Sequence, residues 1–106
     1  MTRERVASLD ALKPGSALKV VVDGIPIALV RESSGDVHAL GDRCSHGDIS
    51  LSEGFVEDDT VECWAHGSKF DLATGAPRNF PAFEPVPVFT VDIDGDDIFV
   101  DTDNRK

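Results

Sequence analysis

The sequence predicts an all-β fold, an antiparallel β-sandwich or small barrel. Short apolar segments with many β-branched residues recur along the 106-residue chain. Turn signals such as Asp23-Gly24 and Ser33-Ser34-Gly35-Asp36 separate these segments at the spacing that is typical of sandwiches and barrels. No segment has the sustained apolar stripe of a helix. We therefore expect a single domain that spans residues 1–106.

Four strands are expected in the N-terminal part of the chain. The second and third form a hairpin, because Asp23-Gly24 favours a two-residue turn between them. Pro26 has no N–H group for a sheet ladder, so the third strand should begin at an edge or near a bulge. A short helical turn is expected near residues 8–12 or 48–51. The four predicted strands are residues 6–9, 16–22, 25–30 and 37–40.

Five further strands and one irregular segment are expected in the C-terminal part. Residues 76–87 hold four of the six prolines and predict a stiff loop, whereas the polar residues 101–106 predict a frayed tail. The five predicted strands are residues 55–57, 60–64, 69–72, 87–93 and 98–100. The predicted core comprises Val20, Val22, Ile27, Leu29, Val37, Leu40, Phe55, Val61, Phe70, Val88, Val91, Ile93, Ile98 and Val100.

Composition and charge limit the class of protein. Apolar residues make up 41% of the chain, and no apolar run is long enough to span a membrane. No apolar segment of a signal peptide follows residues 1–5, so we expect a soluble, cytoplasmic protein. The 20 acidic and 10 basic side chains argue against nucleic-acid binding. The acidity favours a basic protein partner or serves solubility alone, and composition leaves both interpretations open.

Soft metal-ligand chemistry is concentrated in two short segments, Cys44-Ser45-His46-Gly47 and Cys63-Trp64-Ala65-His66-Gly67-Ser68. They contain both cysteines and two of the three histidines of the chain. In a cytoplasmic protein, two cysteines are more often metal ligands or reduced thiols than a disulfide. Zinc sites with two Cys and two His usually pair the cysteines in one segment and the histidines in the other. Here each segment holds one of each, which suits a binuclear iron centre with one iron bound by thiolates and the other by imidazoles.

Cys44-x-His46 and Cys63-x-x-His66, separated by sixteen residues, resemble the signature of the Rieske [2Fe–2S] proteins. The flanking residues 51–54 (Leu-Ser-Glu-Gly) and 66–75 (His-Gly-Ser-Lys-Phe-Asp-Leu-Ala-Thr-Gly) strengthen the resemblance, which extends from about Val6 to Val100. The sequence is most similar to the small Rieske ferredoxins of bacterial multicomponent aromatic-ring-hydroxylating dioxygenases. The resemblance implies a Rieske-type β-fold whose two loops form a cluster-binding part at about residues 41–82.

The resemblance also implies the site and its use. Cys44 and Cys63 would bind the inner iron of a Rieske-type [2Fe–2S] cluster, and His46 and His66 the outer iron. The protein would be an electron carrier, not an enzyme by itself. It would pass single electrons from a flavin-containing ferredoxin reductase to a terminal non-heme iron oxygenase, as a monomer without nucleic-acid or membrane partners.

Three other functions fit the same residues. The chain could be the small subunit of a nitrite reductase or an accessory ferredoxin of iron–sulfur cluster assembly. In a different class, it could be a zinc-stabilised interaction module.

Several neighbouring residues have two interpretations. Trp64 either shields the cluster or faces a partner, or it is an ordinary core residue, and Pro81 belongs either to a loop that covers the cluster or to a linker. High-potential Rieske proteins have a tyrosine where this chain has Phe70, and two further cysteines that this chain lacks. Ser68 keeps the serine position of the family. We therefore expect a reduction potential in the low part of the Rieske range, about −150 mV.

Overall fold

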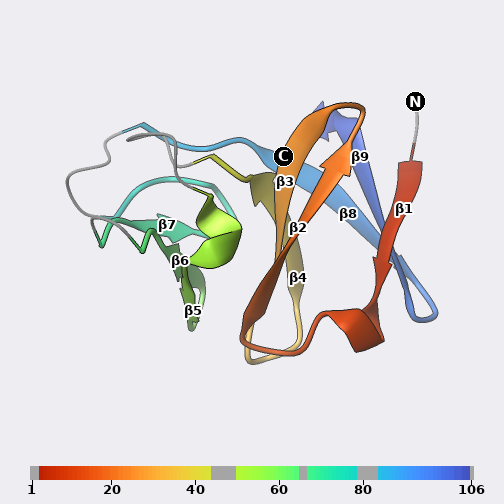
Figure 1. Ribbon diagram of the computed structural model, residues 1–106, viewed down its shortest axis with the longest axis horizontal. Coiled ribbons are helices and arrows are strands. Elements are labelled where there is room, and N and C mark those ends of the chain that lie inside the picture. Colours follow the sequence, from red (N-terminus) through yellow and green to blue (C-terminus); the bar gives the residue numbers. More distant parts are fainter. Residues whose placement is uncertain (1–2, 44–49, 65–66, 79–83, 106) are drawn as a thin grey trace.

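The computed structural model describes residues 3–43, 50–64, 67–78 and 84–105. The described residues form two antiparallel β-sheets and two short 3₁₀ helices (Figure 1), which confirms the predicted all-β class. None of the described helices is long and apolar enough to cross a membrane. In chain order the elements are β1 (Arg3–Ser8), η1 (Leu9–Ala11), β2 (Ser16–Val22), β3 (Ile25–Arg31), β4 (Val37–Gly41), η2 (Leu51–Glu53), β5 (Phe55–Glu57), β6 (Thr60–Glu62), β7 (Lys69–Asp71), β8 (Val88–Asp94) and β9 (Asp97–Arg105).

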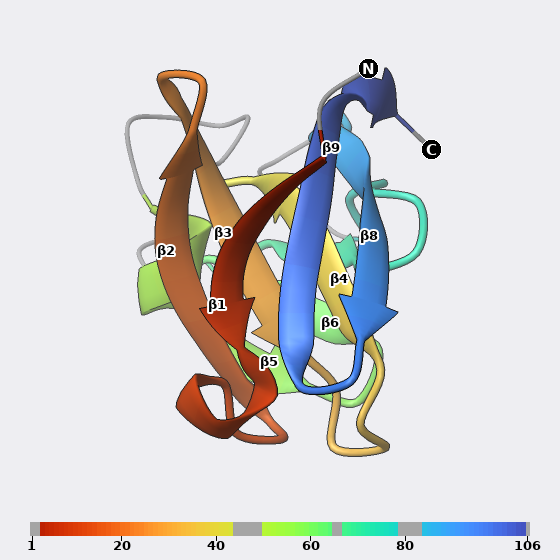
Figure 2. The same ribbon diagram turned by 90° about the vertical axis from the view of Figure 1, so that its right-hand side faces the viewer.

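The larger sheet has six strands in the order β1-β9-β8-β4-β3-β2. It curls until its two edge strands, β1 and β2, contact each other, so that the sheet is a nearly closed barrel (Figure 2). The hairpin predicted at Asp23-Gly24 is present, with φ of 52° and 77° at these two residues. Positive φ at both positions gives the turn the twist that two-residue hairpins require.

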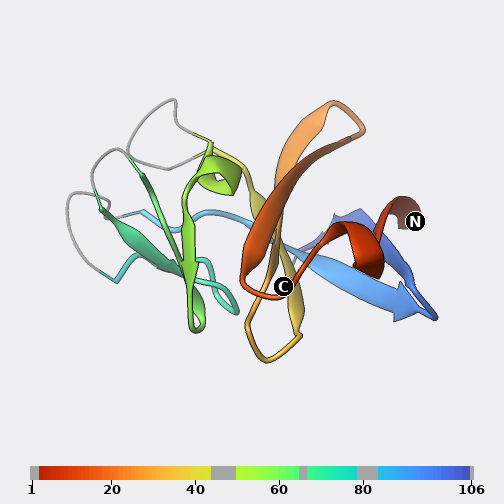
Figure 3. The ribbon, with the colours of Figure 1, turned by 60° about the horizontal axis from the view of Figure 1, so that its bottom comes forward.

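The smaller sheet has three strands in the order β5-β6-β7 and lies beside the barrel (Figure 3). Its register places Val56, Val61 and Phe70 in one row across the three strands. This row faces the barrel, where Val61 and Phe70 are fully buried. The opposite face carries the row of Phe55, Glu62 and Lys69, because side chains alternate between the faces of a strand.

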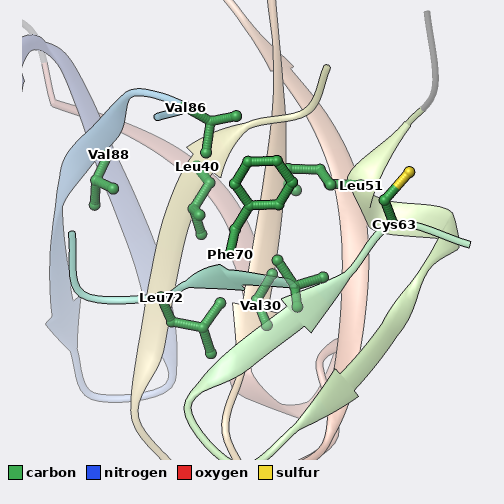
Figure 4. Packing of buried hydrophobic residues seen from close by; sticks show 10 residues of the cluster. Val30, Leu40, Leu51, Cys63, Phe70, Leu72, Val86 and Val88 are labelled. Atoms are coloured by element: carbon green, nitrogen blue, oxygen red, sulfur yellow. The ribbon is translucent and has the colours of Figure 1, made fainter. Parts of the chain in front are cut away.

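Two hydrophobic cores share the third strand. Ile27 and Leu29 point into the barrel, while Ala28 and Val30 belong to a second core that joins the barrel to the smaller sheet. Burial on both faces explains why this strand reads as a continuous apolar run instead of an alternating one. The second core is shown in Figure 4 and contains Ala28, Val30, Leu40, Leu51, Val61, Cys63, Phe70, Leu72, Val86 and Val88.

The structure corrects several expectations. Phe55 and Ile93 are not core residues, since they are 60% and 46% exposed. For Phe55 the reason is strand parity: Val56 takes the inward position. Pro26 does not mark a sheet edge, because β3 lies between β2 and β4. The predicted tail is wrong as well: β9 continues to Arg105 and pairs with β1 and β8.

Short helical turns occur at or next to both predicted positions, residues 8–12 and 48–51. The first is η1, within residues 8–12, and the second is η2, which begins at Leu51, the last residue of the predicted range. The core also includes residues that the strand pattern missed. They are Ala7, Leu12, Ala28, Val30, Ala39, Leu51, Cys63, Leu72, Val86 and Phe89.

Candidate metal centre

The first predicted ligand segment is described only at its two ends. Arg43 and Ser50 form an isolated antiparallel bridge, and the residues between them, which include Cys44 and His46, lie outside the described residues. Beside this bridge, the buried Asp42 accepts a 2.9 Å hydrogen bond at Oδ1 from the Ser52 amide. The two ends of the segment are therefore held together by main-chain and side-chain contacts.

The second predicted ligand segment is closed in the same way. The Cys63 amide donates to the Ser68 carbonyl at 2.8 Å, and the Gly67 amide donates to the Cys63 carbonyl at 2.9 Å. Gly67 has a φ of +74°, a conformation that residues with a Cβ atom rarely adopt. His66 lies outside the described residues. A tight turn of the main chain thus fixes the neighbours of this predicted ligand.

Cys63 is the one predicted ligand within the described residues. Its side chain is fully buried in the second core, together with Leu51 and Phe70. Figure 4 shows Cys63 at the rim of this core, with its sulfur directed away from the Phe70 ring. A thiolate in such a place can bind an inner, solvent-shielded metal. The donor set therefore fits a cysteine-bound iron at this point.

Gly54 allows a close approach of main chain between η2 and β6. A Cβ atom at Gly54, directly after η2, would overlap the carbonyl oxygen of Glu62, the residue before Cys63. The turn that follows the first segment can therefore pack against the strand that leads into the second. In the sequence, Gly54 stands out only as part of the flanking Leu-Ser-Glu-Gly; a glycine between a turn and a strand is the signal of such a close approach.

The proline-rich segment is anchored at both ends. Pro77 forms an isolated bridge with Phe70, and the Arg78 amide donates to the Lys69 carbonyl at 2.7 Å. At the other end, the Val86 amide donates to the Gly75 carbonyl at 2.9 Å. Residues 79–83, with Pro81, lie outside the described residues. The described ends place the start of this segment along β7, next to the second ligand segment.

Charged residues on the outer face of the smaller sheet form paired contacts. Arg78 Nη2 lies 2.7 Å from Asp71 Oδ2 and 3.0 Å from Asp59 Oδ2, and Lys69 Nζ lies 3.3 Å from Glu57 Oε1. The hydrogen bond from Arg78 is the main cause that lowers the pKa of Asp71; burial opposes it, and the amides of Ala73 and Thr74 reinforce it. Arg78 and Lys69 thus partly neutralise the acidic side chains of Glu57, Asp59 and Asp71 on this sheet.

Two other residues singled out from the sequence have clear places. Trp64 is 54% exposed, so it is not a core residue. His38, the histidine outside the two segments, lies in β4, and its Nε2 contacts Glu32 Oε2 within a hairpin of the barrel. This contact gives His38 a structural role in the barrel.

Comparison with known proteins decides the family. A sequence model of the Rieske [2Fe–2S] domain matches residues 2–90. The chain belongs to the Rieske [2Fe–2S] domain family. A Rieske-type [2Fe–2S] cluster is accordingly its cofactor.

Similar Rieske proteins are ferredoxin components of aromatic dioxygenases. The ferredoxin component of biphenyl 2,3-dioxygenase from Rhodococcus jostii (strain RHA1) is 42% identical over 101 residues, which are 95% of this chain and 94% of that protein. The solved ferredoxin of carbazole 1,9a-dioxygenase from Nocardioides aromaticivorans IC177 has a TM-score of 0.88 and 38% identity, over 94% of this chain and 97% of that chain.

A second Rieske structure is informative because it holds a partner. It is described as a complex of reduced oxygenase and oxidised ferredoxin in carbazole 1,9a-dioxygenase. The matching chain has a TM-score of 0.89 and 32% identity, over 98% of this chain and 95% of its own length.

Proposed function

We propose that this Rieske protein is the ferredoxin component of an aromatic-ring dioxygenase system. It carries single electrons from a flavin-containing reductase to a terminal non-heme iron oxygenase, and it is not an enzyme by itself. The observation that carries the proposal is the 42% identity with a biphenyl dioxygenase ferredoxin over 95% of the chain. The oxygenase as partner is supported by the related carbazole dioxygenase complex. The reductase is supported only by the chemistry of a carrier, which needs an electron donor.

The proposed cluster ligands are Cys44 and Cys63 on one iron and His46 and His66 on the other. Three observations support this assignment. The buried side chain of Cys63 is suited to the inner iron. Described contacts close both segments at their bases. Gly54 lets the turn after the first segment pack against β6, which leads into the second segment. We further propose that the chain is a single domain whose cluster-binding part spans residues 41–82.

In this assignment a bound cluster would supply one-electron chemistry, and the residues of the chain would control access to it. The core around Cys63, Leu51 and Phe70 excludes water on the inner side. Trp64, which is exposed beside Cys63, offers an aromatic contact to a partner. Tryptophan is enriched where binding energy concentrates in protein interfaces. Interfaces of electron carriers are small and transient, and an exposed aromatic residue such as Trp64 suits an interface of this size.

The ligand assignment can be tested with the reconstituted protein and single substitutions. His46→Cys and Cys63→Ser should abolish or change the optical and EPR spectra of a Rieske cluster, whereas His38→Gln, at the histidine paired with Glu32, should keep them. Wild-type spectra in both ligand variants would refute the assignment. A colourless protein that contains zinc and no acid-labile sulfide would instead support the zinc-stabilised module.

The electron-transfer role needs a functional assay. The purified protein should be reduced by NADH through a dioxygenase-type flavin reductase, and it should then restore turnover of a terminal oxygenase. Co-purification with a siroheme subunit, with no electron transfer to the oxygenase, would favour the nitrite reductase alternative. We propose that these exchanges occur in the cytoplasm and involve the monomer, which size measurement in solution can check.

A further inference from the structure

Asp42 is one of two buried acidic residues among those the structure describes; the other is Asp101, in β9. Asp42 is only 2% exposed and directly follows β4, two residues before Cys44. A buried carboxylate needs hydrogen bonds to offset the loss of water around it. The hydrogen-bond partners of Asp42 therefore decide whether its burial is stable.

Asp42 is bonded on three sides. Its amide donates to the Pro26 carbonyl at 3.1 Å, and its own carbonyl accepts from the Leu51 amide at 2.6 Å. Its side-chain Oδ1 accepts a hydrogen bond of 2.9 Å from the Ser52 amide. The residue thus links β3 of the barrel to η2, on the far side of the first ligand segment.

Pro26 explains how the Asp42 carbonyl is released for this purpose. In the register of β3 and β4, Ile27 pairs with Gly41, so Pro26 stands opposite Asp42. At such a hydrogen-bonded pair each residue normally donates to the other. Asp42 donates to Pro26, but proline has no N–H to return. The carbonyl of Asp42 is bonded by Leu51 instead, and the chain turns from the sheet into η2.

We propose that Asp42 is a positioning residue for the first ligand segment, an inference that rests on the proposed assignment of Cys44 and His46. Its carboxylate and its carbonyl hold Leu51 and Ser52, and the bridge between Arg43 and Ser50 lies between these contacts and the ligands. The buried Asp42 side chain thereby reinforces the main-chain contacts that hold the two ends of the segment together. Groups behind metal ligands commonly tune the affinity and electronic properties of the metal in this way.

The test compares Asp42→Ala and Asp42→Asn with a matched control, Asp101→Ala. Asp101 is buried to a similar degree but lies in β9, which Figure 1 shows on the side of the barrel remote from the smaller sheet. Each variant is purified with its cluster. The readouts are the EPR line shape of the reduced protein, the rate of cluster loss in the presence of a chelator, and the midpoint of thermal unfolding.

We expect Asp42→Ala to change the EPR line shape and to lose its cluster about tenfold faster, the lower end of the effects known for groups behind metal ligands. Asp42→Asn keeps an acceptor oxygen for the Ser52 amide and should restore both properties. Asp101→Ala should lower the unfolding midpoint without a change in the EPR line shape.

Two results would overturn the inference. One is an Asp42→Ala protein with wild-type line shape and cluster-loss rate. The other is an equal change in Asp101→Ala, which would mark a general loss of stability. An Asp42→Asn variant as damaged as Asp42→Ala would refute the role of the acceptor oxygen. Absence of a Rieske signal from the wild type would instead refute the proposed function, so the two failures are distinguishable.

Discussion

Gly54 lies against the carbonyl oxygen of Glu62 so closely that a Cβ atom would overlap it. This contact joins the end of η2 to the end of β6, and each of these elements adjoins one ligand segment. The main chain at Glu62 cannot move away freely, because Glu62 is paired with Phe55 and Lys69 on its two sides. The spacing of the two ligand segments therefore depends on the absence of one side chain.

We expect Gly54→Ala to disturb the cluster more than the fold of the barrel. The overlap involves main chain, so the two segments must separate. Iron and acid-labile sulfide per chain, measured after reconstitution, should fall well below wild-type values. Gly95→Ala is the control, because a Cβ atom there meets nothing and only the positive φ of 62° opposes it. That variant should lose about 1–2 kcal/mol of stability and keep its cluster. Full cluster content in Gly54→Ala would contradict the expectation.

Gly67→Ala tests the turn that follows His66. Its φ of +74° is close to the +77° of Gly24 at the tip of the β2–β3 hairpin, and neither position has an atom near the expected Cβ. Both alanine variants should therefore lose about 1–2 kcal/mol in urea unfolding. Only Gly67→Ala should alter the EPR spectrum, since only this turn adjoins a proposed ligand. Equal EPR spectra in the two variants would show that the turn at Gly67 does not influence the cluster.

Phe70→Tyr should raise the reduction potential. Phe70 is fully buried in the same core as Cys63, and a hydroxyl that donates to a ligand sulfur stabilises the electron-rich reduced state. Phe89→Tyr is the matched control, because Phe89 is buried in the barrel core. It should lose about 1–3 kcal/mol for an unpaired buried hydroxyl, at an unchanged potential. Spectroelectrochemical titration measures the reduction potentials of both variants. A Phe70→Tyr potential at or below that of the wild type would argue against this prediction.

Arg78→Gln should make the free energy of unfolding depend less on pH in the acidic range. The hydrogen bond from Arg78 lowers the pKa of Asp71, so this pair stabilises the folded state above the unfolded pKa of about 3.9. The contribution disappears as pH falls through the lower, folded pKa, because the carboxyl then binds a proton. The stability gap between wild type and variant in urea unfolding should therefore narrow toward low pH. Arg5→Gln, at the exposed pair with Asp97, is the control for loss of charge.

Trp64→Ala should slow electron transfer to the oxygenase and leave the potential unchanged. The side chain is 54% exposed, so its removal costs the folded protein little. A central aromatic contact is worth about 2 kcal/mol or more in an interface, which corresponds to a rate lower by roughly tenfold or more at limiting concentration. Ile93→Ala, at a 46% exposed residue of the β8–β9 hairpin, is the control. Stopped-flow rates that are equal for the two variants would exclude Trp64 from docking.

The strands were predictable to the extent that their signals are local. Asp23-Gly24 requires a two-residue hairpin turn by itself, and β2 and β5 begin and end where the pattern of residues predicts. Burial was less predictable. Phe55 and Val56 are adjacent apolar residues, and only the register with Val61 in β6 decides which of them faces the barrel. The frayed tail was wrong for the same reason, since the pairing of Asp101 with Arg3 involves β1, a strand at the other end of the chain.

The sequence by itself determined the class of fold and supplied the proposed donor residues, because the type and spacing of Cys and His can be read directly from the chain. It also indicated the Rieske family before any comparison, through the two mixed Cys and His segments. Only the tertiary structure decided how these segments are held. Asp42 and Gly54 act through the Leu51 and Ser52 amides and the Glu62 carbonyl, contacts between residues eight to ten positions apart. Such contacts depend on close packing of main chains from different elements, which local patterns of residues do not encode.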